Sequence, residues 1–174
     1  MKTILVGPDL EENLTISYLS GALRESGYEC SLQAFNHPDD VPKAVNAILR
    51  ARAGLVGLSM VAQRRYGEFQ ILVGDLRRKG YLGHITAGGH FASLRAQDIL
   101  RDTPGLDSIV HHDGEFRILA LLKMLTSGED FPGSLDGVTW RRRDGVIDHT
   151  PPRHVAQIDS IPLPSRRQPA RSSV

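Results

Sequence analysis

The sequence predicts an α/β fold built on a doubly wound, five-stranded parallel sheet with helices on both faces. The strongest indication is an apolar run of strand length without polar alternation, Leu55-Val56-Gly57-Leu58-Ser59-Met60-Val61. Such a run is typical of a strand that helices cover on both sides. Four similar runs alternate with segments of helical periodicity, and 174 residues suit one domain with a sizeable core plus a tail.

Five strands are expected, at residues 3–6, 29–35, 55–61, 84–87 and 108–111. Gly7-Pro8-Asp9 ends the first strand abruptly, because glycine and proline interrupt regular structure. The second strand alternates polar and apolar residues, which favours a position at the edge of the sheet.

A helix is expected between or after these strands in each case. The first begins at Asn13 or Thr15 and ends at Gly27, and the second opens at Asp39-Asp40 with Pro42 just inside. The others are expected at residues 66–79, 93–101 and 115–125, of which the last is strongly apolar. Each helix presents an apolar stripe at the spacing of one helical face.

Strands that alternate with helices imply right-handed crossovers, and we expect the flavodoxin-like strand order 2-1-3-4-5. Beyond Gly128 the pattern changes. Residues 137–143 and 146–149 flank Asp144-Gly145, a good hairpin turn, and a proline-rich stretch follows as an extended connector. We therefore expect an α/β domain over residues 1–128 and a hairpin with a connector tail over residues 129–174.

Composition excludes several classes of function. The 21 basic and 20 acidic residues nearly cancel, so no overall field attracts nucleic acid or a membrane surface. The single cysteine, Cys30, excludes an internal disulfide and a cysteine-ligated iron–sulfur cluster within this chain, and its place in a strand predicts a buried, inert thiol. The first residues resemble a strand more than a signal peptide, and no segment is long enough to span a bilayer. A cytoplasmic protein is expected.

In an open parallel sheet, ligands bind beyond the carboxyl ends of the strands, so the site is sought there. A phospho-acceptor receiver domain needs an aspartate at the end of its third strand. Here that strand ends in Ser59-Met60, which argues against a receiver domain. The acidic loop after the first strand would repel phosphate, and a three-glycine dinucleotide fingerprint is absent there. What remains is a rim rich in small residues, which let a large planar ligand lie close to the backbone: Gly57, Ser59, Gly88, Gly89 and Gly114.

Three motifs together resemble those of a known family. They are Gly57-Leu58-Ser59-Met60 at the end of the third strand, Gly88-Gly89-His90-Phe91-Ala92 after the fourth and Asp113-Gly114-Glu115 after the fifth. This combination resembles the amino-terminal cobalamin-binding domain of cobalamin-dependent radical S-adenosylmethionine enzymes. The likeness extends to residues 135–140 and 158–164, which resemble the connector to the catalytic barrel of those enzymes.

The resemblance implies that cobalamin lies across the carboxyl edge of the sheet, with its nucleotide tail between strands. Ser59 would contact the tail, Gly88 and Gly89 would make room for it, and Gly89→Val should abolish cobalamin retention without unfolding the domain. Asp113-Gly114-Glu115 would form the loop beside the corrin. Where the wider cobalamin fold has an Asp-x-His-x-x-Gly motif, this chain has Asp9-Leu10-Glu11-Glu12-Asn13-Leu14. Glu11 replaces the histidine, so the resemblance implies base-off cobalamin without a protein histidine on cobalt.

Residues beside these motifs complete the candidate site. Met60 is expected as a wall of the pocket, Arg64 is a candidate contact to phosphate or propionamide groups, and His90 either contacts the corrin or caps the next helix. His84 is expected as an edge residue, and His111 and His112 as structural or exposed residues. The candidate cofactor-binding set is Asp9, Glu11, Asn13, Ser59, Met60, Val61, Arg64, Gly88, Gly89, His90, Phe91, Asp113, Gly114 and Glu115. No residue is expected to bind a metal directly.

The radical enzymes carry a Cys-x-x-x-Cys-x-x-Cys motif in their barrel, and this sequence lacks it. Catalysis by this chain alone is therefore not expected, and S-adenosylmethionine and a 4Fe-4S cluster would belong to a separate or missing catalytic part. The first hypothesis is a cobalamin-binding module that serves a methyltransferase-like radical enzyme in cis or in trans. The second is a degenerate, ligand-free domain that acts as a protein-interaction module through its sheet edge, hairpin and tail.

Overall fold

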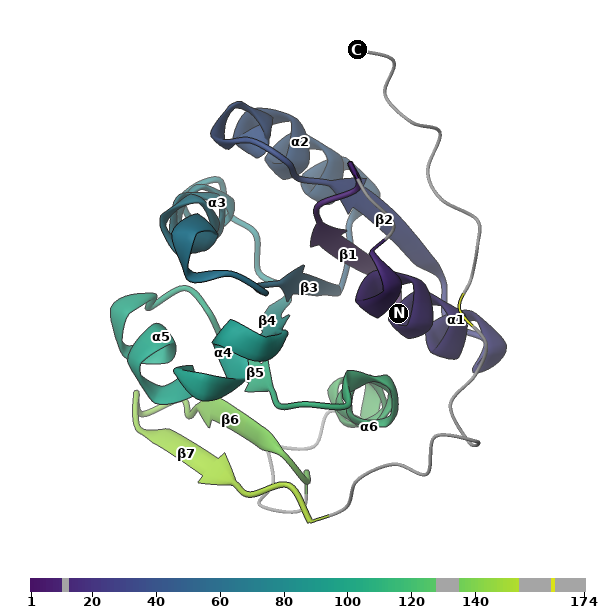
Figure 1. Cartoon of the computed structure of the whole chain (residues 1–174), viewed down its shortest axis with the longest axis vertical. Helices are drawn as coiled ribbons and strands as arrows, with labels where there is room; N and C mark the ends of the chain where they lie inside the picture. The colour runs from purple at the N-terminus through teal and green to yellow at the C-terminus, as the bar shows by residue number, and fades with distance from the viewer. Residues whose placement is uncertain (11–12, 128–134, 154–163, 165–174) are drawn as a thin grey trace.

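A computed structural model describes residues 1–10, 13–127, 135–153 and 164 of the chain. In this part of the chain, seven strands form one sheet in the order β2-β1-β3-β4-β5-β6-β7, with helices on both of its faces (Figure 1). The strands are β1 (Thr3–Gly7), β2 (Cys30–Ala34), β3 (Leu55–Ser59), β4 (His84–Gly88), β5 (Ser108–Val110), β6 (Val138–Arg141) and β7 (Ile147–Thr150).

The first five strands are parallel and take the expected flavodoxin-like order, with β2 at the edge. The sheet is larger than expected because the hairpin joins it. β6 pairs antiparallel with β5, so that Ser108 lies opposite Trp140, and β7 pairs with β6. Five parallel strands are thus extended by two antiparallel ones.

The helices are α1 (Leu14–Glu25), α2 (Val41–Ala51), α3 (Tyr66–Arg78), α4 (His90–Leu94), α5 (Ala96–Asp102) and α6 (Gly114–Ser127). Asn13, one of the two expected caps, accepts a hydrogen bond from the backbone N–H of Ile16 at 3.2 Å. The single helix expected at 93–101 is instead two short helices, because Arg95 leaves the helical conformation at φ −122° and ψ 28°. The first of the two helices, α4, begins at His90, directly after Gly89.

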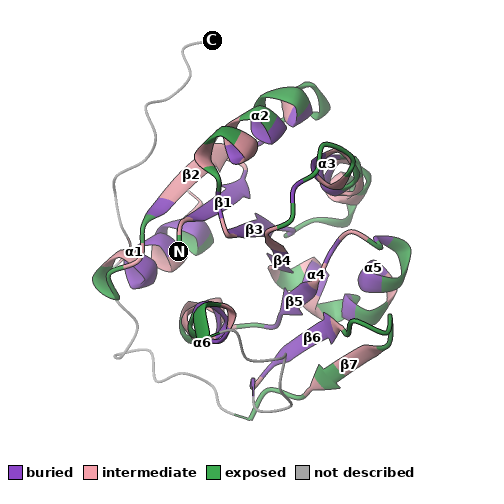
Figure 2. Cartoon of the chain, turned by 180° about the vertical axis from the view of Figure 1, so that it is seen from behind, coloured by how far each residue is buried: buried purple, intermediate pink, exposed green. Residues whose placement is uncertain are grey.

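Two apolar clusters hold the helices to the sheet (Figure 2). On one face, α2, α3 and α5 contribute Val45, Leu72 and Ile99. On the other face, α1 and α6 contribute Leu23 and Leu122. α1 and α6 thus flank the face on which a cleft opens at the carboxyl edge of the sheet.

The hairpin contributes to the second cluster through Val138 and Trp140, which are 0% and 4% exposed. Trp140 belongs to the same cluster as Leu121 and Leu122 of α6. The division of the chain at residue 128 stays a prediction, but these contacts make the hairpin part of the sheet and of its core.

Two side chains expected within strands are enclosed to different degrees: Cys30 is buried and His84 is partly buried. Burial raises the pKa of the Cys30 thiol to about 11, in keeping with an inert role. His84 was expected as an edge residue, and this is wrong because β4 is an interior strand. Its Nε2 lies 2.8 Å from Ser108 Oγ, and burial lowers the pKa of the imidazole to about 4.

The connector tail expected after the hairpin lies largely outside the described residues, as does Glu11. Across the part that is described, no helix combines the length and the apolar character needed to cross a bilayer.

Candidate functional site

A cleft of about 320 Å³ opens at the carboxyl ends of β1, β3, β4 and β5, on the face that α1 and α6 flank. Its position is the one at which ligands bind in doubly wound sheets. It is lined by Leu5, Thr15, Ile16, Leu19, Gly57, Leu58, Ser59, Thr86, Ala87, Gly88, Gly89, His90, Ser93, Val110, His112, Asp113, Gly114, Glu115 and Ile118.

The floor of the cleft is open because two strand positions carry no side chain. A Cβ atom added to Gly57 would lie 2.8 Å from Cδ2 of Leu5, and one added to Gly88 would lie 3.4 Å from the Val110 carbonyl oxygen. Residues two apart on a strand face the same side, so Gly57 and Ser59 both face the cleft. Removing side chains here leaves a depression against the backbone.

Ser59 places a hydroxyl in this depression. Its Oγ is buried and has no hydrogen-bond partner among the described residues. A buried hydroxyl without a partner costs free energy, and buried polar groups normally find one. The cleft therefore contains a polar atom that a bound ligand would satisfy.

Gly89 has a different role from Gly88. Its φ is +105°, and an added Cβ would lie 3.0 Å from the carbonyl oxygen of Met60. Glycine is needed here for the turn from β4 into α4, where any other residue would be strained. Of the two glycines, Gly88 opens the floor and Gly89 shapes the backbone.

Ser93 joins two loops of the cleft. Its hydroxyl donates to the Gly89 carbonyl oxygen at 3.0 Å and accepts from the backbone N–H of His112 at 3.1 Å. His112 has a left-handed backbone, with φ +50°, which a residue other than glycine adopts only when its surroundings hold it. The loop after β4 thus fixes the loop after β5.

The loop after β5 brings carboxyl groups to the cleft. Asp113, Gly114 and Glu115 lie at the start of α6 and line it. Burial raises the pKa of the Glu115 carboxyl, and the nearby negative charge of Asp113 also raises it. These groups can accept hydrogen bonds from amide N–H groups of a ligand.

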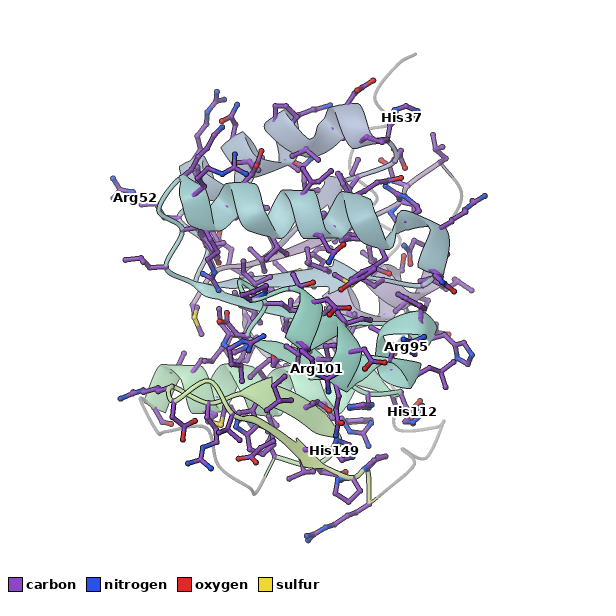
Figure 3. All side chains as sticks on the ribbon, turned by 90° about the vertical axis from the view of Figure 1, so that its left-hand side faces the viewer. His37, Arg52, Arg95, Arg101, His112 and His149 are labelled. Carbon is purple, nitrogen blue, oxygen red and sulfur yellow. The ribbon has the colours of Figure 1, made fainter. Side chains whose placement is uncertain are left out.

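Behind this loop, His111 is buried and its Nε2 lies 2.7 Å from Thr139 Oγ1, which lies 2.9 Å from Nδ1 of His149. The pKa of His111 is lowered to about 4, mainly by burial and further by the positive charges of His149, His112 and Arg117. Figure 3 shows His112 and His149 on the same side of the molecule. Among the described residues, no group of three or more potential metal ligands comes together.

Exposed apolar side chains lie in the segments that follow β1, β3, β4 and β5. Leu10 and Leu94 are 78% and 67% exposed, and Leu14, Val61 and Phe116 are exposed as well. They belong to loops and helix ends at the carboxyl edge of the sheet, the edge at which the cleft opens. None of these five side chains, called the apolar rim below, lines the cleft itself, but all offer exposed apolar surface at this edge to a large flat ligand or to a protein.

Half of the candidate residues line the cleft. They are Ser59, Gly88, Gly89, His90, Asp113, Gly114 and Glu115. Thr15, Leu19, Thr86 and Ser93 also line it, although the sequence did not single them out. The role of Ser93 could not be predicted from the sequence, because it depends on a contact with His112, 19 residues away, as well as on one with Gly89, 4 residues away.

The other candidates lie elsewhere. Asp9 and Asn13 line a smaller cavity of about 30 Å³ between β1 and β2, where the carboxylate of Asp9 accepts from Asn36. Met60 is fully buried on the opposite face, where Phe91 also packs, at 5.8 Å between its ring centroid and that of Tyr66. The two remaining described residues, Val61 and Arg64, are exposed beyond β3.

A wound parallel sheet with a glycine-floored cleft at its carboxyl edge defines a small-molecule-binding α/β domain. The sequence matches the model of the B12-binding domain over residues 5–122. This chain belongs to the B12-binding domain family.

One relative and one solved structure are similar to nearly the whole of this chain. An uncharacterized methyltransferase, PH0819 of Pyrococcus horikoshii, is 22% identical over 95% of this chain and 38% of its own length. The cobalamin-dependent S-adenosylmethionine radical enzyme OxsB, with aqua-cobalamin and S-adenosylmethionine bound, superposes with a TM-score of 0.78 at 22% identity, over 94% of this chain and 24% of OxsB. The chain thus spans well under half the length of either protein.

More distant structures share the fold at lower similarity. A CheY-like protein, TadZ of Pseudomonas aeruginosa, superposes with a TM-score of 0.56 at 11% identity, over 72% of this chain and 99% of its own. At the position where a receiver domain needs its phospho-acceptor aspartate, β3 of this chain ends in Ser59. The shared fold therefore does not extend to that chemistry.

Proposed function

We propose that this chain is a cobalamin-binding module that holds the cofactor base-off, with its nucleotide tail in the cleft and its corrin on the apolar rim. The observation that carries the proposal is the unpartnered Ser59 hydroxyl above a floor of Gly57 and Gly88. A volume of about 320 Å³ suits a nucleotide-sized group and is too small for the whole cofactor. A tail held in the cleft is drawn away from the cobalt, which is the base-off state.

The described residues supply three kinds of contact. Ser59 donates a hydrogen bond to the tail, for which its hydroxyl has no competing partner among them. Asp113 and Glu115, which line the cleft, accept from amide groups at the corrin edge. Leu94 and Phe116 lie outside the cleft and offer exposed apolar surface at the same edge of the sheet. Glu11 stands where the wider fold has its cobalt-binding histidine, so we propose that no protein histidine binds cobalt.

Bound cobalamin supplies a cobalt centre that can carry a methyl group. We propose that the module presents this centre to a radical S-adenosylmethionine enzyme of methyltransferase type, either in the same chain or in a separate one. The family membership and the names of PH0819 and OxsB support this setting. S-adenosylmethionine and an iron–sulfur cluster would belong to the catalytic part, since Cys30 is the only cysteine in the sequence.

The first test is retention of the cofactor. Purified protein is mixed with excess hydroxocobalamin and desalted, and its visible absorbance is recorded. Red protein with about one cobalamin per chain is expected. Colourless protein would defeat the proposal and favour the alternative, a protein-interaction module, which a stoichiometric partner without cobalamin would then support.

The second test concerns the axial ligand. The bound cofactor is reduced to cob(II)alamin, and its electron paramagnetic resonance spectrum is recorded. An axial nitrogen, from benzimidazole or histidine, splits each cobalt line into three, whereas an axial oxygen does not. Unsplit lines are expected. Because His90 and His112 line the cleft, a threefold splitting that His90→Ala or His112→Ala removes would contradict the absence of a histidine ligand.

A further inference from the structure

One buried cation holds the loop at the cleft from behind. Arg117 lies near the start of α6, and the residue is only 7% exposed. Its Nη1 donates to the carbonyl oxygens of His111 at 3.2 Å and of Asp113 at 2.9 Å. These two carbonyls flank His112, so one guanidinium fixes both ends of the left-handed turn.

The same guanidinium also binds the segment before the hairpin. Nε donates to the carbonyl oxygen of Asp136 at 3.1 Å, and Nη2 donates to its carboxylate at 3.3 Å. The second carboxylate oxygen of Asp136 accepts from the backbone N–H of Arg153, just beyond β7. Asp136 does not line the cleft, yet it is joined through Arg117 to the loop that does.

The loop around His112 depends on these hydrogen bonds to keep its conformation. A left-handed backbone at a residue other than glycine costs on the order of 1 kcal/mol, and it persists only where its surroundings hold it. His112 is held by Ser93 on one side and by Arg117 on the other. If either anchor moves, the loop can relax toward an ordinary conformation, and the cleft changes shape.

We propose that Arg117 is a positioning residue which transmits the placement of the segment after the hairpin, through Asp136, to the loop at the cleft, and thereby sets cobalamin affinity. This inference rests on the proposed function. Coupling of this kind is reciprocal, so a bound cofactor must also order the segment near Arg153. A following domain or a partner that displaces this segment would loosen the cofactor.

The test uses Asp136→Ala, because removing Arg117 itself would leave several buried acceptors unpaired and risks unfolding. Asp136→Asn serves if the alanine variant does not fold. The matched control is Asp144→Ala, which breaks an ion pair with Arg142 in the same hairpin without a contact to the cleft loop. Amide hydrogen exchange of residues 111–115 is measured without ligand, and cobalamin affinity is measured by titration.

In Asp136→Ala we expect faster exchange confined to residues 111–115 and a Kd about five- to tenfold higher, which corresponds to a coupling of ordinary size. We expect the control to match the parent protein in both. Cobalamin added to the parent protein should slow exchange at the backbone amides of Thr150 and Arg153, since the two residues between them are prolines without an amide hydrogen. The inference would be overturned if, in Asp136→Ala, the exchange rate of residues 111–115 stayed unchanged or rose equally across the whole sheet. It would also be overturned by an unchanged Kd. A parent protein that binds no cobalamin would refute the proposed function and the claim about affinity. Hydrogen exchange without ligand would still test whether Arg117 and Asp136 hold the loop at residues 111–115.

Discussion

Ser59 and Gly88 lie opposite each other on neighbouring strands, in register at the carboxyl ends of β3 and β4. The serine brings a hydroxyl without a partner among the described residues, and the glycine leaves the space in front of it open. Together they place one hydroxyl group on a cleft floor that is otherwise free of side chains. A domain whose only task was to be stable would gain from filling this space, so the pair is most simply understood as ligand-binding.

Replacing Ser59 should separate stability from binding. Ser59→Ala removes a buried hydroxyl that has no partner in the described protein, so the free energy of unfolding should stay the same or rise by up to about 1 kcal/mol. Cobalamin affinity should fall about tenfold if the hydroxyl bonds the ligand. Urea unfolding and cobalamin titration measure the two effects.

Ser108→Ala is the matched control for that experiment. The Ser108 hydroxyl lies 2.8 Å from Thr86 Oγ1 and 2.8 Å from His84 Nε2. Its loss should lower the free energy of unfolding by about 1 kcal/mol or more. A Ser59→Ala variant that is destabilised as much as Ser108→Ala would show that Ser59 has a structural partner after all.

Filling the floor should block binding. Gly88→Leu places a side chain in the cleft from a position with no positive φ, where an added Cβ meets only the Val110 carbonyl oxygen at 3.4 Å. Cobalamin should no longer stay bound through desalting, while the circular dichroism spectrum stays that of the parent. Gly74→Leu, on the exposed side of α3, is the control and should retain cobalamin. Equal retention by both variants would remove Gly88 from the binding floor.

Gly89 is a poor site for the same experiment, although the sequence suggested it. With φ at +105° and Met60 backbone 3.0 Å from an added Cβ, Gly89→Val should strain the turn and destabilise the domain by about 1–3 kcal/mol. Loss of binding in that variant would then report misfolding as well as steric exclusion. Thermal unfolding of Gly89→Val beside Gly88→Leu distinguishes the two roles.

Acid should destabilise the fold in a defined window. Burial lowers the pKa of His84 and of His111 to about 4, so both are neutral in the native state at pH 6. Asp107 partly opposes this shift for His84, whereas Arg77 adds to it. In the unfolded chain a histidine titrates near pH 6.5, so the unfolded state binds more protons between pH 6.5 and about 4.

The free energy of unfolding should therefore be constant above pH 7 and fall by about 4 kcal/mol between pH 6.5 and pH 4.5, about 2 kcal/mol for each histidine. Urea unfolding at several pH values measures it. His111→Gln should flatten part of this slope, whereas His37→Gln, at an exposed side chain, should leave it unchanged. The same slope in all three proteins would show that His111 does not carry the effect.

The hairpin should be needed for the core. Trp140 is 4% exposed and packs in the cluster that also holds α6, so Trp140→Ala should lower the free energy of unfolding by about 3–5 kcal/mol. Val146→Ala, in the exposed turn of the same hairpin, should cost less than about 0.5 kcal/mol. Comparable small losses in both would show that the domain folds without the hairpin, as a boundary at residue 128 would require.

Local sequence patterns predict the alternation of strands and helices, the order of the parallel strands and the segments that reach the carboxyl edge. Apolar runs and helical periodicity are local signals, and the crossover rule turns them into a topology. Glycines at residues 57 and 88 and the serine at residue 59 could be placed at the site for the same reason. All of these follow from which residues end which strands.

Which side chains face the cleft, and which contacts hold them, depends on how the strands and helices pack together. Strand alternation already places Met60 and Ser59 on opposite faces, but only the packing of the helices decides that the cleft opens on the face of Ser59. Ser93 and Arg117 reach the cleft loops through contacts made by the packed fold, and Trp140 joins the core only because β6 pairs with β5. Such contacts depend on the positions of segments far apart in the chain, and no local pattern of residues encodes them.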